Sequence, residues 1–219
     1  MKYELKGNDL PVAIITLDKG ESIITEKGAM SWMSESMEMK TNAGKGFFSR
    51  AFSGESIFQN VFTATKDGDF IAISSSFPGQ ILVFDVSHQP IIVQKKAFLA
   101  REETVDMQIH FQKKLGAGFF GGEGFIMQKF TGNGNVFLEI DGSLTEYDLK
   151  DGETLILDTG YLAAMEASVK VDVVTVKGIG NVMFGGEGLF NTKVTGPGKV
   201  WIQSMPISKL ASLLNVGNK

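Results

Sequence analysis

The sequence predicts an all-β protein that consists of three tandem repeats of about 65 residues, each folded as a β-sandwich. Three observations lead to this fold class. The composition combines 26 glycines and 17 phenylalanines with only 5 prolines, which is typical of many short strands joined by glycine turns. Apolar residues alternate with polar ones in several segments, and one glycine-rich motif occurs three times.

The repeated motif is an aromatic residue followed by a turn with glycine and glutamate. It occupies three segments: Phe52–Phe58, Phe120–Ile126 and Phe184–Phe190. The second and third copies follow the first by 68 and 132 residues, counted between their central glycines. Because one match of this length can arise by chance, a true repeat must relate other segments by the same offsets.

Two further blocks obey these offsets. Gly20–Ile24 falls on Gly152–Ile156, and both read Gly-Glu, then Ser or Thr, then two aliphatic residues. Thr131–Phe137 matches Thr195–Trp201 without a gap. The sequence therefore predicts one compact unit of three repeats, at about residues 1–74, 75–140 and 141–205, and a C-terminal helix at 206–216.

The apolar pattern predicts about five short strands in each repeat, folded into two facing sheets. Residues 105–111 alternate apolar and polar side chains, as a half-buried strand does, and residues 37–39 and 169–173 repeat the pattern. The runs Phe70–Ile73 and Ile81–Phe84 are apolar throughout, which favours strands buried on both faces.

The C-terminal segment is the exception to the β pattern. Ile207, Leu210, Leu213 and Leu214 follow Pro206 at helical spacing. We favour a short helix that docks on the sheets, and a helix that binds a partner is the alternative.

Composition and charge exclude several classes of protein and site. The formal net charge of −4 argues against the clustered Lys and Arg that nucleic acids and anionic membranes require. A chain without cysteine has no disulfide, thiolate ligand or cysteine nucleophile, which fits a reducing cytoplasm. The N-terminal segment lacks the apolar core of a secretory signal, and no stretch approaches the ~20 apolar residues of a spanning helix. We expect a soluble, cytoplasmic protein.

Four segments carry a resemblance to a known family. They are Gly20–Met33, with the pattern Gly-Glu-Ser-Ile-Ile…Gly-Ala-Met-Ser-Trp-Met, the Phe-x-Gly-Glu-Gly turns at Phe120–Gly124 and Phe184–Gly188, and Thr195–Gly198. Together they are similar to the family named for the mitochondrial protein of "altered inheritance of mitochondria", over about residues 3–210.

The resemblance implies a fold like that of the tryptophan RNA-binding attenuator protein, with three attenuator-like β-sandwich units per chain and a trimeric ring. It implies no established activity, because the bacterial members are of unknown function. The mitochondrial members look like factors for inner-membrane organisation. This chain shows no transit peptide, so that role is not carried over.

Three small units in one chain also suggest an assembly. A repeat of about 65 residues is marginal as an independent fold, and sheet edges invite aggregation unless they are covered. Three units around a pseudo-threefold axis would cover one another's edges, and further chains would cover the outer ones. The expected partner is therefore another copy of the chain, in a homo-oligomer that is most simply a ring-like trimer.

Three glutamates, Glu55, Glu123 and Glu187, occupy the equivalent position of the repeated turns. Near a common axis they would form a carboxylate cluster that could hold a ligand or a hard cation. The favoured alternative is that each accepts backbone N–H groups in its own turn or pairs with a neighbouring Lys or Arg. The sequence predicts no cofactor.

Two glycine-rich loops carry paired phenylalanines: Phe47 and Phe48 in one loop, and Phe119 and Phe120 in the other. Neither loop ends in Gly-Lys-Ser/Thr, so phosphate binding is not indicated. Exposed tips of this kind would contact a membrane surface or an apolar partner. Phenylalanines packed in the core beneath the turn are the favoured alternative.

RNA binding would require basic residues that repeat with the fold. Lys95 and Lys96 have only one basic counterpart in the other two repeats, Lys27, so nucleic acid is not an expected partner.

No catalytic motif is recognisable, and His88 and His110 have no triplicated partners. The sequence leans away from an enzyme and leaves two hypotheses of different classes. The first is a non-catalytic oligomeric scaffold or interaction protein, acting at a membrane surface in one version. The alternative is a ring that binds a small ligand or a metal between repeats.

Overall fold

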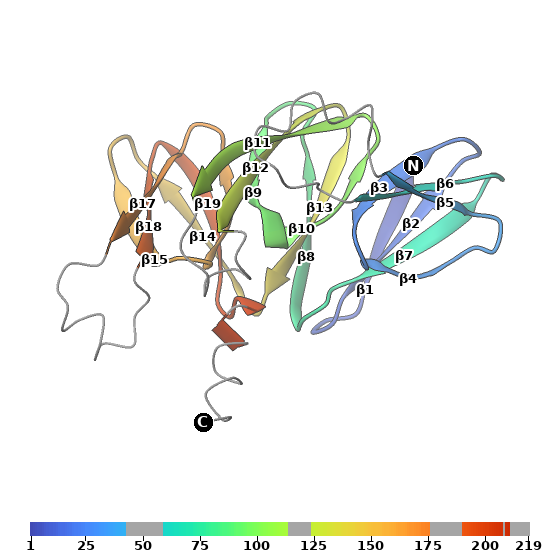
Figure 1. Cartoon of the computed structure of the whole chain (residues 1–219), viewed down its shortest axis with the longest axis horizontal. Helices are drawn as coiled ribbons and strands as arrows, with labels where there is room; N and C mark the ends of the chain where they lie inside the picture. Colours follow the sequence, from blue (N-terminus) through green and yellow to red (C-terminus); the bar gives the residue numbers. More distant parts are fainter. Residues whose placement is uncertain (43–58, 114–123, 176–189, 208, 211–219) are drawn as a thin grey trace.

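Over the described residues the chain is all-β apart from two short helical turns, which confirms the all-β part of the predicted fold class. The computed structural model describes residues 1–42, 59–113, 124–175, 190–207, 209 and 210. In these ranges the strands β1 to β19 form four sheets, named A to D here (Figure 1).

Sheets A and B contain the N-terminal strands. Sheet A has the order β1 (Lys2–Lys6), β2 (Val12–Leu17), β7 (Asp69–Ser74), β4 (Met30–Met33). Sheet B has the order β5 (Glu38–Asn42), β6 (Gln59–Thr63), β3 (Ser22–Glu26), β10 (Phe98–Glu102), β13 (Asn135–Asp141), β8 (Gly79–Asp85).

Sheets C and D contain the C-terminal strands. Sheet C has the order β11 (Val105–Lys113), β12 (Phe125–Gly132), β9 (Ile91–Gln94), β16 (Leu162–Glu166), β19 (Gly198–Gln203), β14 (Leu144–Leu149). Sheet D has the order β15 (Thr154–Asp158), β18 (Phe190–Thr195), β17 (Lys170–Thr175). A 3₁₀ turn, η2 (Lys95–Ala97), separates β9 from β10.

The sheets follow one another along the long axis of the molecule, from the blue N-terminal strands to the orange C-terminal ones (Figure 1). Each neighbouring pair of sheets encloses one apolar core. The core between A and B includes Ile15, Phe62 and Ile71, and the core between C and D includes Met127 and Val194. Burial alternates with a period of two along β2, whereas β9 and β10, which lie between two cores, are buried in succession.

Strand β13 lies between two of these cores and is buried on both faces. Val136, Leu138 and Ile140 pack in the core between sheets B and C, whereas Phe137 packs in the core between A and B. The edge of the Tyr3 ring contacts the Phe137 ring, with the ring centres 5.3 Å apart. A strand in this position needs apolar residues in succession, because both of its faces are removed from water.

Two of the predicted core positions are wrong. Met39, expected on the buried face of residues 37–39, is 51% exposed in the edge strand β5, although Met37 just before that strand is buried. Ile109 is 40% exposed, and the pairing of β11 with β12 shifts register between Ile109 and Phe111. Strand β11, like β5, is the edge strand of its sheet, so part of its apolar face is left uncovered.

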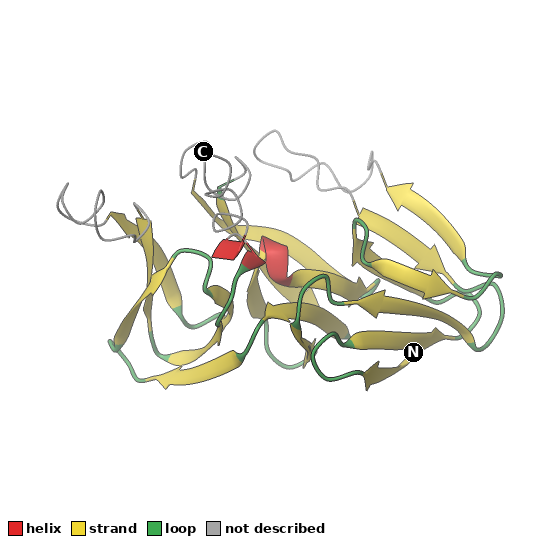
Figure 2. Ribbon diagram, turned by 90° about the horizontal axis from the view of Figure 1, so that it is seen from below, coloured by secondary structure: helices red, strands yellow, loops and turns green. Residues whose placement is uncertain are grey.

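The chain becomes helical just after Pro206. Ile207, Lys209 and Leu210 have helical conformation, and the Lys209 N–H donates to the Pro206 carbonyl at 2.8 Å. This turn and η2 lie near the middle of the molecule (Figure 2). The rest of the predicted helix at 206–216 lies outside the described residues. Among the described helical residues, none belongs to a helix long and apolar enough to cross a membrane.

Candidate functional site

The residues that the sequence singled out lie outside the described part of the chain. These are Glu55, Glu123 and Glu187 of the repeated turns, and Phe47, Phe48, Phe119 and Phe120 of the glycine-rich loops. The cation, ligand and membrane hypotheses for these residues therefore stay predictions.

The structure instead brings together two acidic residues at the end of β13. Glu139 and Asp141 are two positions apart, so they lie on one face of the strand, and each is only 7% exposed. They continue the face that Phe137 begins, but they replace its apolar surface with two carboxyl groups. A buried carboxyl group is costly unless hydrogen bonds or an opposite charge compensate it.

A hydrogen bond from the connection between β7 and β8 offsets the cost of burying the Glu139 carboxyl group. Its Oε2 atom accepts the backbone N–H of Ser76 at 2.7 Å. The neighbouring Ser75 hydroxyl donates to the Phe77 carbonyl at 2.6 Å, which tightens the same connection. Glu139 thus binds the connection between β7 and β8 through Ser76, which lies 63 residues earlier in the chain.

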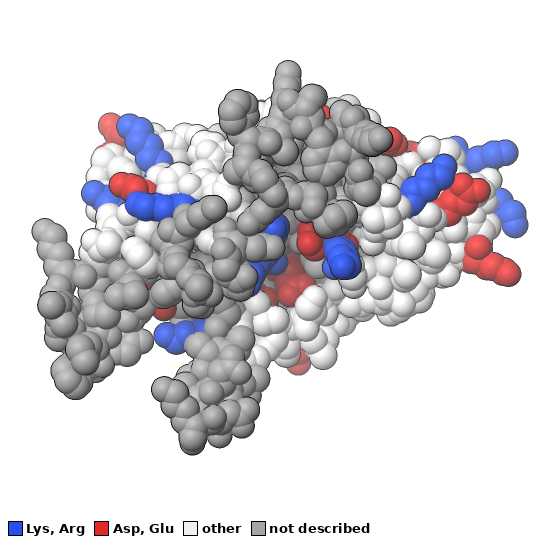
Figure 3. All heavy atoms as spheres, in the orientation of Figure 1, with Lys and Arg blue, Asp and Glu red and all other residues white. Residues whose placement is uncertain are grey.

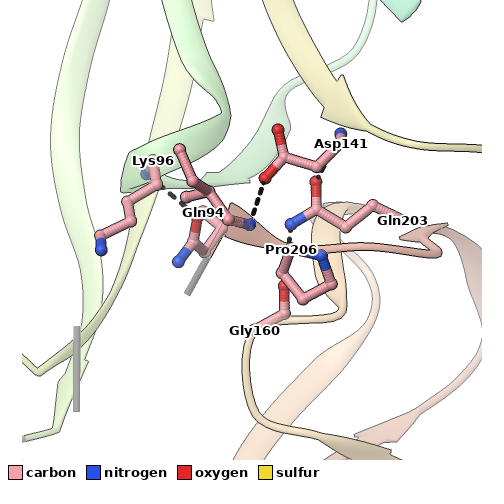
Figure 4. Close-up of a pocket in the computed structure, with 7 residues that line it drawn as sticks. Gln94, Lys96, Asp141, Gly160, Gln203 and Pro206 are labelled. Atoms are coloured by element: carbon pink, nitrogen blue, oxygen red, sulfur yellow. Dashed lines mark hydrogen bonds between the residues drawn. The ribbon is translucent and has the colours of Figure 1, made fainter. Parts of the chain in front are cut away.

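A hydrogen bond from the beginning of the C-terminal helical turn offsets the cost of burying the Asp141 carboxyl group. Its Oδ2 atom accepts the backbone N–H of Ile207 at 2.7 Å. Its own backbone N–H donates to Oε1 of Gln203 at 3.1 Å, and Nε2 of Gln203 donates to the Gly160 carbonyl at 2.8 Å (Figure 4). The Gln203 side chain, at the end of β19, therefore joins the end of β13 to the turn that precedes β16.

Burial and mutual proximity raise the pKa values of both carboxyl groups. For Glu139, loss of hydration is the largest cause, and the Asp141 carboxylate adds to it, which raises the pKa from 4.5 to about 7. Loss of hydration also raises the pKa of Asp141, but the Ile207 N–H, the Glu139 side chain and the Lys96 charge oppose the rise. The interaction between the two side chains raises the pKa of Glu139 and lowers that of Asp141, so Glu139 is the group that holds its proton to higher pH.

A small cavity of about 10 Å³ adjoins Asp141, with room for a single water molecule. It is lined by Gln94, Lys96, Asp141, Gly160, Gln203, Pro206 and Ile207. The Lys96 side chain extends away from Asp141, and the Lys96 backbone N–H donates to Oε1 of Gln94 at 3.0 Å (Figure 4). A cavity of this size does not accommodate an organic substrate or a cofactor. The hydrogen bonds of the acidic pair join it to the connection before β8 and to the C-terminal turn.

Arg101 is a second charged group in the interior. It lies in β10 and is 1% exposed. Its Nη1 atom donates to the Val105 carbonyl, and its Nη2 atom donates to Oε1 of Gln59 at 3.5 Å. Burial lowers the pKa of this guanidinium to about 10, so it stays charged at neutral pH. Arg101 connects β10 to β6 and to the start of β11.

The described residues contain no group of three or more His, Asp or Glu side chains that could hold a metal ion. On the face drawn in Figure 3, acidic and basic side chains of the described residues are interspersed, without a continuous basic tract.

The sequence pattern does not single out the acidic pair, because neither acid occurs three times at matched positions. When the gap-free sequence match of Thr131–Phe137 with Thr195–Trp201 is extended, Glu139 falls on Gln203, and no triplicated acid marks the position. The available signal was local: two acids at alternate positions, Glu139 and Asp141, follow the apolar run Val136–Leu138.

Comparison with known proteins gives a family and a fold. The family described as "Mitochondrial biogenesis AIM24" matches residues 3–205. An uncharacterised protein of Streptococcus pyogenes serotype M6 is 29% identical over 221 aligned positions, which cover 95% of this chain and 87% of that protein. The crystal structure of a Streptococcus pyogenes protein solved as a structural genomics target superimposes with a TM-score of 0.81 at 22% identity, over 99% of both chains.

Proposed function

The chain belongs to the Mitochondrial biogenesis AIM24 family, and on that premise we propose that it is a non-catalytic oligomeric scaffold or interaction protein. In this proposal each chain consists of three attenuator-like β-sandwich units about a pseudo-threefold axis, and the chains assemble as a homotrimer. The observation that carries the proposal is that sheets B and C each combine strands from two successive units.

The strand order supports the division into three units. The order β2-β7-β4 in sheet A corresponds to β8-β13-β10 in sheet B and to β14-β19-β16 in sheet C. A register shift interrupts the pairing at Met30/Trp32, at Phe98/Ala100 and at Leu162/Ala164, which are the same offsets as in the sequence repeat. A bulge that recurs at matched positions favours duplication over three independent solutions.

The sharing of sheets supports a structural role. Strand β3 of the first unit pairs with β10 of the second, and β9 of the second pairs with β16 of the third. Each unit thereby completes the sheet of its neighbour, as in a repeat protein whose units are stable only side by side. A rigid array of this kind presents a continuous surface to partners.

Native mass spectrometry of gently purified protein tests the proposal. A trimer without a bound small molecule is the expected result. A trimer that carries one to three copies of a discrete small mass would instead favour the alternative, a ring that binds a ligand or cation near Glu55, Glu123 and Glu187. A monomer at micromolar concentration would overturn the assembly.

The membrane version of the proposal depends on the two glycine-rich loops. Flotation with liposomes of neutral and anionic phospholipid should carry the protein upward, and a variant with Phe47, Phe48, Phe119 and Phe120 changed to Ser should stay in the aqueous fraction. Wild-type protein that stays in the aqueous fraction would overturn membrane contact and leave the scaffold role to protein partners.

A further inference from the structure

Two strand pairs connect successive parts of the chain, and they have the same register. Strand β10 pairs with β3 so that Ala100 lies opposite Thr25 and Arg101 opposite Ile24. Strand β16 pairs with β9 so that Ala164 lies opposite Val93 and Met165 opposite Ile92. At the offsets of the sequence repeat, these two pairs are equivalent residue for residue.

A third pair of this kind would consist of β4 and β15, but each of these strands is a sheet edge. Among the described strands, β4 pairs only with β7 at the end of sheet A, and β15 pairs only with β18 at the end of sheet D. The two edges lie at opposite ends of the molecule (Figure 1), so they do not meet within one chain.

The side chains of these two edges are exposed where their counterparts are buried. Trp32 of β4 is 48% exposed and Ile156 of β15 is 54% exposed. The residues that match Trp32, Ala100 and Ala164, are both 0% exposed, and Ile92, which matches Ile156, is also 0% exposed. In the internal pairs a neighbouring strand covers these positions, so a paired strand would also cover Trp32 and Ile156.

The two edges also lack the charges that protect most other edges of the described sheets. Strand β4 contains no charged residue, and β15 contains only Asp158 at its end. The edge strands β1, β5, β11, β14 and β17 each contain at least two charged residues, and β8 contains Asp85. Lysine and acidic residues on an edge oppose pairing with another chain, and an uncharged apolar edge permits it.

We propose that β4 of one copy of the chain pairs with β15 of the next copy, antiparallel and in the register of the internal pairs. Trp32 then lies opposite Leu157, and Met33 lies opposite Ile156. This inference rests on the proposed homo-oligomer and names its interface. Because each copy offers one β4 and one β15, the contact is head-to-tail and closes into a ring when the rotation per copy divides a full turn.

Charge substitution at one opposed pair tests the interface. Met33→Lys and Ile156→Glu alone should each raise the dissociation concentration of the oligomer about tenfold or more, because each places a charge in a paired apolar edge. The double variant M33K/I156E should regain part of the affinity, since opposite charges directly across an antiparallel pair attract. Met39→Glu is the matched control for Ile156→Glu, because Met39 is 51% exposed and Ile156 is 54% exposed, but Met39 lies on the charged edge β5.

The readout is native mass spectrometry across a dilution series, with circular dichroism to verify that each variant is folded. A folded M33K and a folded I156E that both keep the wild-type assembly would overturn the β4–β15 interface and leave the scaffold proposal standing. A wild-type monomer would overturn both.

Disulfide cross-linking tests the register independently, because the chain contains no cysteine of its own. Oxidised M33C/I156C should give covalent oligomers on a non-reducing gel, since opposed residues bring their Cβ atoms within about 5.5 Å. W32C/I156C should cross-link far less, because adjacent residues of a strand point to opposite faces. Equal cross-linking of the two variants would overturn the proposed register.

Discussion

Strand β13, which contains Glu139 and Asp141, combines an apolar part that packs in two cores with an acidic part that accepts hydrogen bonds. The first part of β13 is apolar because two cores enclose it, and its last part is acidic because backbone N–H groups of Ser76 and Ile207 converge there. A carboxyl oxygen is a strong acceptor for such groups, and hydrogen bonds to charged acceptors contribute more than neutral ones. The cost is that burial raises the pKa values of both carboxyl groups.

The raised pKa of Glu139 should make the stability of the fold depend on pH. The pKa of Glu139 is raised from 4.5 to about 7, so the group stabilises the fold fully below about pH 4.5 and loses this contribution as pH rises through about 7. Glu139→Gln keeps an acceptor for Ser76 and a donor for Asp141 but has no charge. We expect it to flatten the decline between pH 5 and 8, a difference of about 1 kcal/mol after solvent screening.

Urea denaturation at a series of pH values measures this effect. Glu146→Gln, on an exposed position of β14, is the matched control and should leave the slope unchanged. An unaltered slope in E139Q would show that another group carries the pH dependence.

Arg101 gives a second prediction for a single residue. Methionine occupies the matching positions Met33 and Met165, so the site accommodates a long apolar side chain. Arg101→Ala should lower the free energy of unfolding by about 3 kcal/mol, because it leaves a cavity and a buried Val105 carbonyl without its donor. Arg101→Met should cost less, since it fills the space. Urea unfolding of the two variants decides, and equal losses would show that filling the space contributes nothing.

At the scale of the element, Gly79 sets how closely β8 approaches β13. A Cβ atom on Gly79 would lie 1.8 Å from the Ile140 carbonyl oxygen, which belongs to the backbone of the partner strand. Gly79→Ala should therefore cost about 3 kcal/mol or more, because the strand pair must separate. Gly20→Ala is the comparison: Gly20 has φ +88° but open space around it, so only backbone strain of about 1 kcal/mol is expected. Thermal or urea unfolding ranks the two, and the reverse order would contradict the close approach.

The C-terminal turn should depend on one acceptor. Asp141→Ala removes the partner of the Ile207 N–H, so hydrogen exchange at that amide should accelerate about tenfold or more. The Val86 amide, which donates to the Gly134 carbonyl in a distant connection, should keep its protection. Unchanged exchange at Ile207 would mean that the turn is held by other contacts.

The positions of the strands were predictable from the sequence, whereas the exposure of apolar residues in the edge strands was not. Residues 70–73 and 169–173 show the expected burial, because their apolar pattern directly reflects a core on one or both sides. The predictions for Met39 and Ile109 were wrong because both residues lie in edge strands, which expose apolar residues that alternation assigns to the core. The acidic pair depends on contacts 63 and 66 residues apart, which no local pattern reveals.

At the scale of the whole molecule, three cores in one described chain unfold together only if the shared sheets couple them. If the outer edges also pair between copies, the melting temperature should rise with protein concentration, because mass action favours the associated folded state. Scanning calorimetry over a hundredfold range of concentration measures this. A melting temperature that does not depend on concentration would indicate that folding and assembly are separate.

The shared sheets also impose an order in time. During synthesis β3 leaves the ribosome long before β10, and β9 long before β16, so each edge stays open until the next part of the chain is made. Long intervals between partner strands slow folding and expose open edges to the wrong neighbours. Strand β15 pairs with the later strand β18 on one side, but the described chain supplies no partner for its other edge. That edge stays open after synthesis is complete until, on the pairing proposed above, another finished copy binds it.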